Sequence, residues 1–320
     1  MLDLIYYPDD RPGITRIKRG RGFSYVAPDG TTIADQSERK RLASLAVPPA
    51  YESVWMCPKP NGHLQATGRD ARRRKQYRYH PDWTTAQAEK KFEDLAEFGA
   101  TLPRIRARVR RDLETEAGDK PFALACAVAM IDRFAMRVGH PDYTAQNGSY
   151  GALTLRRQHL TLSDTNIALR YTAKGGKRVR KQLSDRTLAR RLHEIGNIDG
   201  GEVLTWLGDD GEPRSLQSSD LNAYLSEAAD RDGTTAKVFR TWAGTLAAFE
   251  VAETGNASIK DMAEAAAQRL HNTATIARNS YIHPAVIDLA GEDIDSPAQA
   301  TPSGLRAAER RLLQFLQDAG

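Results

Sequence analysis

The sequence predicts an α+β protein with a β-rich N-terminal domain, followed by a mostly α-helical domain that contains a small antiparallel sheet. Three observations support this prediction. Short alternating runs separated by Gly-containing turns fill residues 1–80, apolar residues recur at helical spacing after residue 84, and a second group of alternating runs interrupts the helices. We expect domains at 1–82 and 83–290, then a linker and C-terminal helix at 291–320.

Composition places the chain among ordinary globular proteins, because 40% of its 320 residues are hydrophobic and 27% are charged. No apolar run approaches the roughly 18–20 residues of a membrane span, so we expect no membrane partner. The N-terminus lacks the pattern of a secretory signal. Cys57 and Cys126 lie far apart, which predicts neither a disulfide framework nor a zinc site and fits a reducing cytoplasm.

Positive charge is concentrated in two segments. The net charge is +5, and residues 69–78 hold six cations against the single acid Asp70, while residues 174–181 hold five cations and no acid. Such clusters attract phosphate with an affinity that depends on salt. The pattern indicates a polyanionic partner.

The N-terminal domain is expected to consist of hairpins. Asp29-Gly30 is a strong turn signal, and Asn61-Gly62 is expected to supply the positive φ angles of a second turn. The expected strands cover residues 14–18, 23–26, 32–33, 53–57 and 63–67.

Residues 75–80 form one more expected strand, in which aromatic side chains alternate with cations and an amide. One interpretation is a solvated edge strand protected by Lys and Arg. The other is a ribbon whose side chains contact bases and phosphates in a DNA groove. We favour the second, because Arg72, Arg73 and Arg74 directly precede it.

The second domain is expected to begin with helices. Apolar residues at helical spacing predict a helix over 84–98, Pro103 predicts a restart that continues to Leu113, and Pro121 predicts the start of a third helix. That helix is expected to end near Gly139, so Arg137 would lie at its end.

A small sheet is expected next, with strands at 152–155, 160–162, 167–173 and 179–183. The sequence Lys174-Gly175-Gly176-Lys177 predicts a tight hairpin turn with Lys174 at its mouth. Most lysines in such turns are simply solvated.

Further helices are expected at 188–195, from a cap at Ser219 or Asp220 to Ala228, from a cap at Thr234 or Thr235, at 259–270 and at 305–317. A short helix capped by Asn272-Thr273 would deliver Tyr281, and residues 140–151 are expected to form a loop. Lys237 and Arg240 share a face that is not the apolar one. Burying this face would be costly without an anion, which indicates a phosphate partner.

Several functional motifs are absent from the sequence. It contains no phosphate-binding Gly-Lys-Ser/Thr loop and no metal-binding His or Cys motif, so we expect neither ATP nor a metal cofactor. Tyr281 and the basic segments around Arg137, Lys174 and Lys237/Arg240 therefore suggest phosphoryl transfer assisted by protein cations. Arginine suits this chemistry because it stays protonated and its planar fork matches phosphate oxygens.

In order and spacing, these segments resemble the type IB DNA topoisomerases of the compact bacterial and poxvirus-like kind. The resemblance covers the chain up to about residue 290. Its carriers are Val54-Trp55-Met56-Cys57, residues 61–70, Arg74 to His80, Met136-Arg137-Val138-Gly139, Lys174-Gly175-Gly176-Lys177, Lys237 to Trp242, and Asn272-Thr273 through Ser280-Tyr281.

The resemblance implies a clamp around duplex DNA. Tyr281 would cut one strand through a 3′-phosphotyrosyl intermediate and religation would follow, which relaxes supercoils without ATP or metal. Arg137 and Arg240 would clamp the phosphate, Lys174 would be the general acid, and Lys237 would lie beside the phosphate. Gln76, Tyr77 and Tyr79 would contact the major groove, with Arg72, Arg73, Arg74 and Lys75 beside them. A monomeric, cytoplasmic, nucleoid-associated enzyme is expected.

One position departs from the family pattern. The family often has a histidine nine residues before the nucleophile, where this chain has Asn272. Asparagine can donate a similar hydrogen bond without charge, so we assign it that role. Two alternatives stay open: a tyrosine recombinase, which shares the catalytic set but typically has a histidine at the position of Lys237, and a non-catalytic DNA-binding protein.

Overall fold

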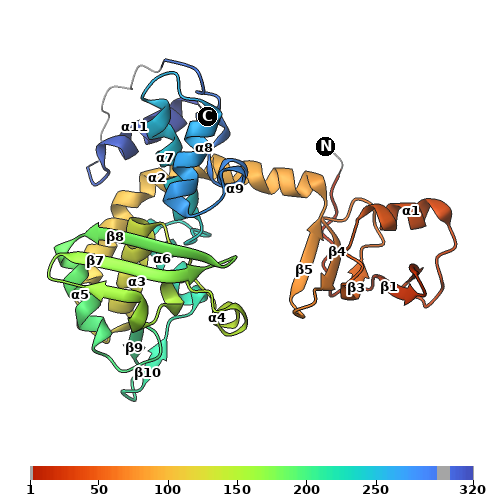
Figure 1. Cartoon of the computed structure of the whole chain (residues 1–320), viewed down its shortest axis with the longest axis horizontal. Coiled ribbons are helices and arrows are strands. Elements are labelled where there is room, and N and C mark those ends of the chain that lie inside the picture. Colours follow the sequence, from red (N-terminus) through yellow and green to blue (C-terminus); the bar gives the residue numbers. More distant parts are fainter. Residues whose placement is uncertain (1–2, 294–302, 320) are drawn as a thin grey trace. The chain divides into compact units, whose positions relative to one another are not determined.

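The computed structural model describes residues 3–293 and 303–319, without the side chains of 88–90 and 142–143 (Figure 1). The chain divides into two compact units, residues 1–90 and residues 91–320, here called the N-terminal unit and the C-terminal unit. This division falls inside the long helix α2 (Pro81–Asp112), whose first turn contains the predicted domain boundary at residue 82. Most of the predicted linker, residues 294–302, lies outside the described residues.

The N-terminal unit is built on a five-stranded antiparallel sheet with the order β2-β1-β3-β4-β5. Ile14, Val54 and Met56 of the sheet pack against Leu42 of helix α1, and all four side chains are buried. The strand at residues 75–79 lies at one edge of the sheet, a position that does not by itself decide between the two interpretations. The elements are β1 (Ile14–Arg19), β2 (Gly22–Val26), α1 (Gln36–Ser44), β3 (Glu52–Met56), β4 (Leu64–Arg69) and β5 (Lys75–Tyr79).

The two predicted turns differ in outcome. Gly30 has a φ of 87° and Val26 pairs with Thr32, which confirms the Asp29-Gly30 turn. The prediction for Asn61-Gly62 was wrong, since neither residue has a positive φ. Glycine is needed at 62 for space instead, because a Cβ there would lie 2.4 Å from the sulfur of Cys57.

The C-terminal unit is mostly helical around a three-stranded sheet of order β6-β7-β8 (Figure 1). Helices α3 and α5 pack against this sheet, and α8, α9, α10 and α11 pack on or around α7. The elements are α3 (Lys120–Phe134), α4 (Pro141–Asn147), β6 (Leu160–Leu162), β7 (Asn166–Ala173), β8 (Lys177–Ser184), α5 (Arg186–Gly196), β9 (Thr205–Leu207), β10 (Pro213–Ser215), α6 (Ser218–Ala229), α7 (Val238–Ala252), α8 (Ile259–Leu270), α9 (Ala274–Tyr281), α10 (Pro284–Ile287) and α11 (Ala307–Asp318).

Proline at the start of a helix behaved as predicted, and proline in mid-helix did not. Pro121 lies in the first turn of α3, as expected. Pro103, predicted to break the chain into two helices, lies inside the continuous helix α2. Buried Leu102 and Ile105 flank it, so tertiary packing offsets the loss of one helical hydrogen bond.

Other local predictions need correction. Residues 152–154 form a turn of 3-10 helix instead of a strand, and α4 occupies the predicted loop at 140–151. Helix α3 ends at Phe134 instead of near Gly139, α6 is capped by Gln217, and the cap residue of α7 is Lys237. Helix α1 and the hairpin of β9 and β10 were not predicted.

Candidate active site

The two helices of the C-terminal unit that lead to Arg137 and Asn272 end in the same way. Helix α3 ends at Phe134 and α8 at Leu270, and each is followed by a non-glycine residue in the left-handed conformation, Ala135 with φ 50° and His271 with φ 51°. A left-handed residue is a common helix stop, because it turns the chain away from the axis.

The two left-handed residues turn the chain so that the predicted site residues Arg137 and Asn272 lie next to each other. Arg137 follows the left-handed Ala135 by two residues, and Asn272 follows His271 directly. Arg137 Nη2 donates a 2.7 Å hydrogen bond to Asn272 Oδ1. The Nδ2 of Asn272 is buried and has no hydrogen-bond partner in the described part of the chain. Because an orphaned buried donor is costly, this group is available to an acceptor that enters the site.

Two cations, the buried Arg240 and the partly buried Lys181, bind carbonyls at the ends of these helices. Arg240 Nη2 donates to Leu270 O at 3.0 Å, and its Nη1 donates to Ala135 O. Lys181 Nζ donates to Arg269 O at 2.9 Å and also to Phe134 O. Cations are favourable at helix C-termini, where unpaired carbonyls carry partial negative charge.

Lys181 was not predicted as a site residue, although the sequence contained a signal. It lies between Val179 and Leu183 on the inward-facing side of β8, at the alternation that marks a buried face. Burial lowers the pKa of Lys181 to about 7, and the charges of Arg269, Arg240 and Arg137 add to this effect.

Tyr281 is the last residue of α9, a helix whose N-cap is Thr273, as predicted. The Arg240 guanidinium carbon lies 5.1 Å from the centroid of the Tyr281 ring. Burial alone would raise the pKa of the phenol, but the nearby charges of Arg240, Arg137 and Lys237 together lower it. A lowered phenol pKa favours the phenolate, the form in which a tyrosine acts as a nucleophile.

Two lysines, Lys237 and Lys91, add positive charge near Tyr281. Lys237 is exposed at the start of α7. Lys91 on α2 was not predicted; its Nζ lies 5.2 Å from the Tyr281 ring centroid and donates to the carbonyl of Ser280. Burial lowers the pKa of Lys91 to about 8, with a contribution from the charge of Lys237. The signal in the sequence was its position four residues before buried Leu95, on the apolar side of the helix.

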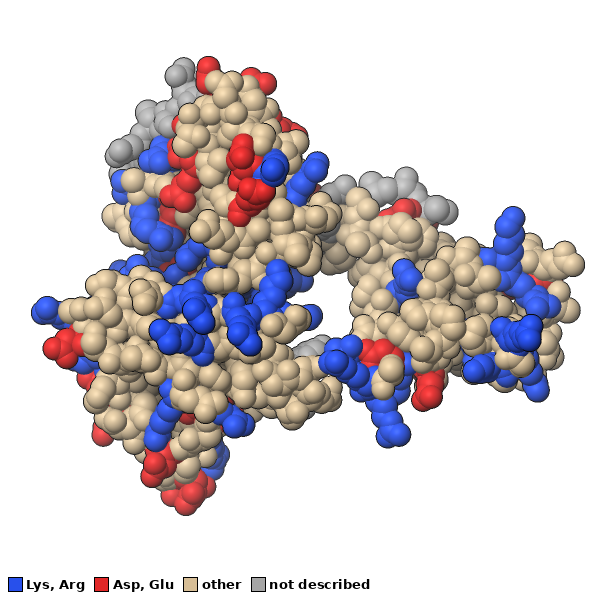
Figure 2. Space-filling view, in the orientation of Figure 1, with Lys and Arg blue, Asp and Glu red and all other residues tan. Residues whose placement is uncertain are grey.

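Lys174 is placed differently from the other predicted catalytic residues. It is exposed in the turn between β7 and β8, where Gly175 and Gly176 have φ angles of 81° and 74°. The predicted hairpin is therefore confirmed. Lys and Arg side chains gather on the visible face of the C-terminal unit over this hairpin (Figure 2).

His271 lies one residue before Asn272, the position at which the family often has a histidine. Burial, together with the charges of Lys181 and Arg240 and those of Lys177 and Arg137, lowers its pKa to about 4. His271 is therefore neutral at ordinary pH and adds no charge to the cluster.

In the N-terminal unit, Asp70 organises the turn that joins β4 to β5. Its carboxylate accepts hydrogen bonds from the side chains of Arg74, at 2.8 Å, and Gln76, at 3.0 Å, and from the backbone of Arg72. The hydrogen bond from Arg74 is the main cause that lowers the pKa of Asp70 to about 2. Arg73 adopts a left-handed φ of 58° in the same turn.

The predicted DNA-contacting residues of β5 lie on two faces of the strand. Tyr77 and Tyr79 are exposed and stack with ring centroids 6.1 Å apart, and Lys75 lies over Tyr77 and pairs with Asp9 at 2.6 Å. Gln76 points to the opposite face, since successive side chains of a strand alternate. The structure thus groups Lys75, Tyr77 and Tyr79, and separates Gln76 from them.

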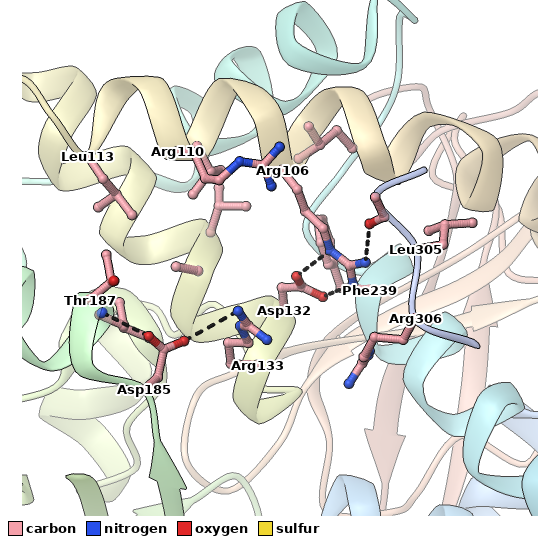
Figure 3. Close-up of a pocket in the computed structure, with 16 residues that line it drawn as sticks. Arg106, Arg110, Leu113, Asp132, Arg133, Asp185, Thr187, Phe239, Leu305 and Arg306 are labelled. Carbon is pink, nitrogen blue, oxygen red and sulfur yellow. Dashed lines mark hydrogen bonds and ion pairs between the residues drawn. The ribbon is translucent and has the colours of Figure 1, made fainter. Parts of the chain in front are cut away.

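A cavity of about 410 Å³ lies elsewhere in the C-terminal unit, between α2, α3, α5 and residues 304–306 (Figure 3). Arg106 crosses one end of it and pairs with Asp132 at 2.9 Å and with the fully buried Glu309 at 2.8 Å. None of the predicted site residues lines this cavity. Among the described residues, no cluster of three or more His, Cys, Asp or Glu could hold a metal, and no helix is long and apolar enough to cross a membrane.

Two family models match the chain. One, described as bacterial DNA topoisomerase IB, N-terminal domain, matches residues 22–70. The other, described as eukaryotic DNA topoisomerase I, catalytic core, matches residues 80–280, well over half of the chain. The second match contains Arg137, Lys174, Lys237, Arg240 and Asn272, and it ends one residue before Tyr281.

Individual relatives agree with these matches. DNA topoisomerase 1B of Acanthamoeba polyphaga mimivirus is 26% identical over 293 residues, which cover 87% of each chain. DNA topoisomerase 1B of Vaccinia virus (strain Copenhagen) is 24% identical over 124 residues, 39% of each chain. A solved structure of the XerH site-specific recombinase, in a post-cleavage complex with its palindromic difH substrate, shares 15% identity with a TM-score of 0.39, over 57% of this chain and 47% of that one. That likeness is too low to support an argument.

Proposed function

We propose, since this chain belongs to the type IB DNA topoisomerase family, that Tyr281 is the nucleophile with which it relaxes supercoiled duplex DNA. The observation that carries this assignment is the position of the Tyr281 ring against the Arg240 guanidinium, with cations as the leading charges that act on its phenol. The match of both family models favours a topoisomerase over a tyrosine recombinase.

The proposed reaction is a reversible transesterification. The Tyr281 phenolate oxygen attacks the scissile phosphorus, the bond from phosphorus to the 5′ oxygen breaks, and a 3′-phosphotyrosyl ester forms. The leaving 5′ oxygen takes a proton from Lys174. After the free end has rotated, the 5′ hydroxyl attacks the ester, returns its proton and releases Tyr281. Because the ester conserves the bond energy, the cycle requires neither ATP nor a metal.

The cations have distinct proposed roles in this step. Charge develops on the non-bridging oxygens of the phosphorane, and fixed donors aimed at it lower the barrier. Arg137 and Arg240 supply charged donors, among them the buried Nε of Arg240, which has no hydrogen-bond partner among the described residues, and Lys237 supplies a mobile one. Asn272 keeps its Oδ1 on Arg137 and directs the orphaned Nδ2 to a non-bridging oxygen.

DNA contact by β5 is the second part of the proposal. Tyr77, Tyr79 and Lys75 would enter the groove from one face, and Gln76 would reach a base edge from the other after leaving Asp70. Arg72, Arg73 and Arg74 would contact phosphates. Changing Gln76 to Ala should then alter cleavage-site preference more than DNA affinity; a uniform loss of affinity over all sequences would contradict base contact.

The physiological setting is also a proposal. We propose that the protein acts as a monomer on the chromosome in the cytoplasm. Sedimentation of the protein with and without a short duplex tests the monomer: one protein per duplex is expected, and a free dimer would contradict it.

The decisive experiment traps the covalent adduct and maps both of its ends. We expect relaxation of a supercoiled plasmid in EDTA without ATP, and an adduct that joins Tyr281 to a 3′ phosphate. Tyr281→Phe should abolish both. Tyr171→Phe is the matched control, because Tyr171 is a buried neighbour of Arg240 and Arg137 whose pKa burial raises to about 12. An adduct in Tyr281→Phe, or one at a 5′ phosphate, would overturn the assignment.

A further inference from the structure

The backbone around Tyr281 is held by two residues from different helices. Lys91 Nζ on α2 donates to the carbonyl of Ser280, the residue before Tyr281. Thr245 Oγ1 on α7 donates to the carbonyl of Tyr281 itself at 3.1 Å. Consecutive carbonyls at the end of α9 are thus anchored from two sides.

Residue 244 of α7 lies so close to Tyr281 that it has no room for a side chain. A Cβ on Gly244 would lie 2.7 Å from Tyr281 O and 3.0 Å from Tyr281 Cβ. Glycine at 244 therefore lets α7 touch the nucleophile's backbone directly. The position of Tyr281 is then fixed on the α7 side by sterics and on the α2 side by Lys91.

Lys91 differs from an ordinary surface lysine in what surrounds it. Its Nζ lies 4.5 Å from the centroid of the Phe92 ring and 5.2 Å from that of Tyr281, so it contacts aromatic faces as well as the carbonyl of Ser280. Phe92 in turn packs edge-on against His283, two residues after Tyr281, at 5.5 Å between centroids. Both flanks of the nucleophile are therefore attached to the same turn of α2.

We propose that Lys91 is a positioning residue for the cleavage reaction: it fixes the last turn of α9 so that the Tyr281 phenol is held in line with the scissile phosphate. Lys91 acts through Tyr281 and is not itself a phosphate ligand. A cation at this helix end satisfies unpaired carbonyls, and its stem and head pack on aromatic rings. This proposal rests on the proposed role of Tyr281 as nucleophile.

Positioning has a measurable signature, because a displaced nucleophile slows the chemistry in both directions while DNA binding is unaffected. A misplacement of about 1 Å can cost on the order of 10²-fold in rate. We expect Lys91→Met to slow single-turnover cleavage and religation together by roughly 10- to 100-fold, with an unchanged Kd for uncleaved duplex. Lys91→Arg should recover most of the rate, because it retains a cationic donor. Lys260→Met, at an exposed lysine of α8, is the matched control.

A substrate with sulfur in place of the scissile 5′ bridging oxygen separates positioning from acid catalysis. A thiolate leaves without protonation, so this substrate should rescue Lys174→Ala and should not rescue Lys91→Met. If Lys91→Met fails to fold, as shown by a large fall in Tm, Lys91→Gln provides the same test with a neutral donor.

Three results would overturn the proposal: wild-type rates in Lys91→Met, equal loss in Lys91→Arg and Lys91→Met, or rescue of Lys91→Met by the sulfur substrate. Failure of the nucleophile assignment looks different. In that case Tyr281→Phe itself would still form an adduct, whatever the Lys91 variants do.

Discussion

The two basic regions of the molecule hold their cations with different partners. In the turn and edge strand at 69–79, the partners are carboxylates: Asp70 holds Arg74 and Asp9 holds Lys75, all near the surface. In the candidate active site, the buried Arg240 and the partly buried Lys181 bind backbone carbonyls at the ends of α3 and α8.

This difference explains how one set of residue types can serve two purposes. A carbonyl dipole holds a cation in place without cancelling its charge, so the active site retains a positive field for a phosphate and for a phenolate. A carboxylate cancels the charge of the cation that it pairs with, until DNA phosphates replace the carboxylate as the partner of that cation. We therefore expect changes in the active site to affect rate and stability together, and changes in the edge strand to affect mainly salt-dependent affinity.

The largest effect is expected for Arg240→Ala. Loss of a charged donor aimed at the phosphorane should lower the cleavage rate by about 10²- to 10³-fold. The carbonyls of Ala135 and Leu270 lose their donor, which should reduce the free energy of unfolding by about 1–3 kcal/mol. Single-turnover cleavage and urea unfolding measure the two effects. Arg190→Ala, a substitution of an exposed arginine of α5, is the control. If Arg240→Ala lowered the cleavage rate without lowering the free energy of unfolding, rate and stability would not be coupled in the active site as this difference between the two regions predicts.

The next largest effect is expected at Asn272, and almost none at its neighbour His271. Asn272→Ala should slow cleavage by about 10- to 100-fold, the value of one hydrogen bond to a charged group. His271→Asn keeps a residue that tolerates the left-handed conformation and should be near wild type. Because the pKa of His271 is lowered to about 4, its titration should leave the pH–rate profile between pH 5 and 8 without an inflection. If His271→Asn cleaved DNA slowly and Asn272→Ala cleaved it at the wild-type rate, the functional residue would be His271 and not Asn272.

Lys181→Met tests whether the partly buried Lys181 has the lowered pKa. The folded pKa of about 7 lies below the ordinary 10.5, so the unfolded state binds more protons between these values. The contribution of Lys181 to stability therefore rises with pH in this window, by at most about 1.4 kcal/mol per pH unit. The destabilisation caused by Lys181→Met should be larger at pH 9 than at pH 6.5. Equal values in urea unfolding at both pH values would indicate an ordinary lysine.

The smallest effects are expected at the edge strand. Replacing Arg72 and Arg74 by Gln and Arg73 by Asn should make the salt dependence of DNA affinity shallower, by about 0.9 in the slope for each phosphate that the protein no longer neutralises. Asp70→Asn should act in the opposite direction, because Arg74 loses its carboxylate. Binding titrations at several salt concentrations measure both slopes. An unchanged slope in the triple variant would mean that these arginines face solvent in the complex.

Much of the fold could be predicted from local patterns. The turn at Asp29-Gly30, the glycine turn after Lys174 and the cap at Thr273 follow from turn chemistry, and most strands of the first 80 residues follow from alternation. The geometry of the Asn61-Gly62 turn does not, because close packing against Cys57 decides it. The continuous helix through Pro103 and the end of α3 at Ala135 could not be predicted, because tertiary packing and a distant donor, Arg240, decide them. Residues of α4 and of the β9–β10 hairpin carry no strong periodic signal.

Prediction of the site shows the same limit. The sequence identified Arg137, Asn272, Arg240, Lys237 and Tyr281, which the structure brings into one cluster. It did not identify Lys91 or Lys181, because a lysine on an apolar face acquires meaning only when the carbonyls that it binds are known. The roles of all these residues, and of Lys174 and the β5 residues, stay predictions until they are tested.

The buried carboxylate of Glu309 has a practical consequence for dissecting the protein. It lies on α11 and holds Arg106 of α2 and Arg306. A fragment that stops at residue 290 would leave Arg106 with Asp132 as its remaining acid partner among those described and would uncover the apolar side of α7. The smallest fragment suited to independent expression therefore extends through α11, and proteolysis should release the last helix only after the C-terminal unit has opened.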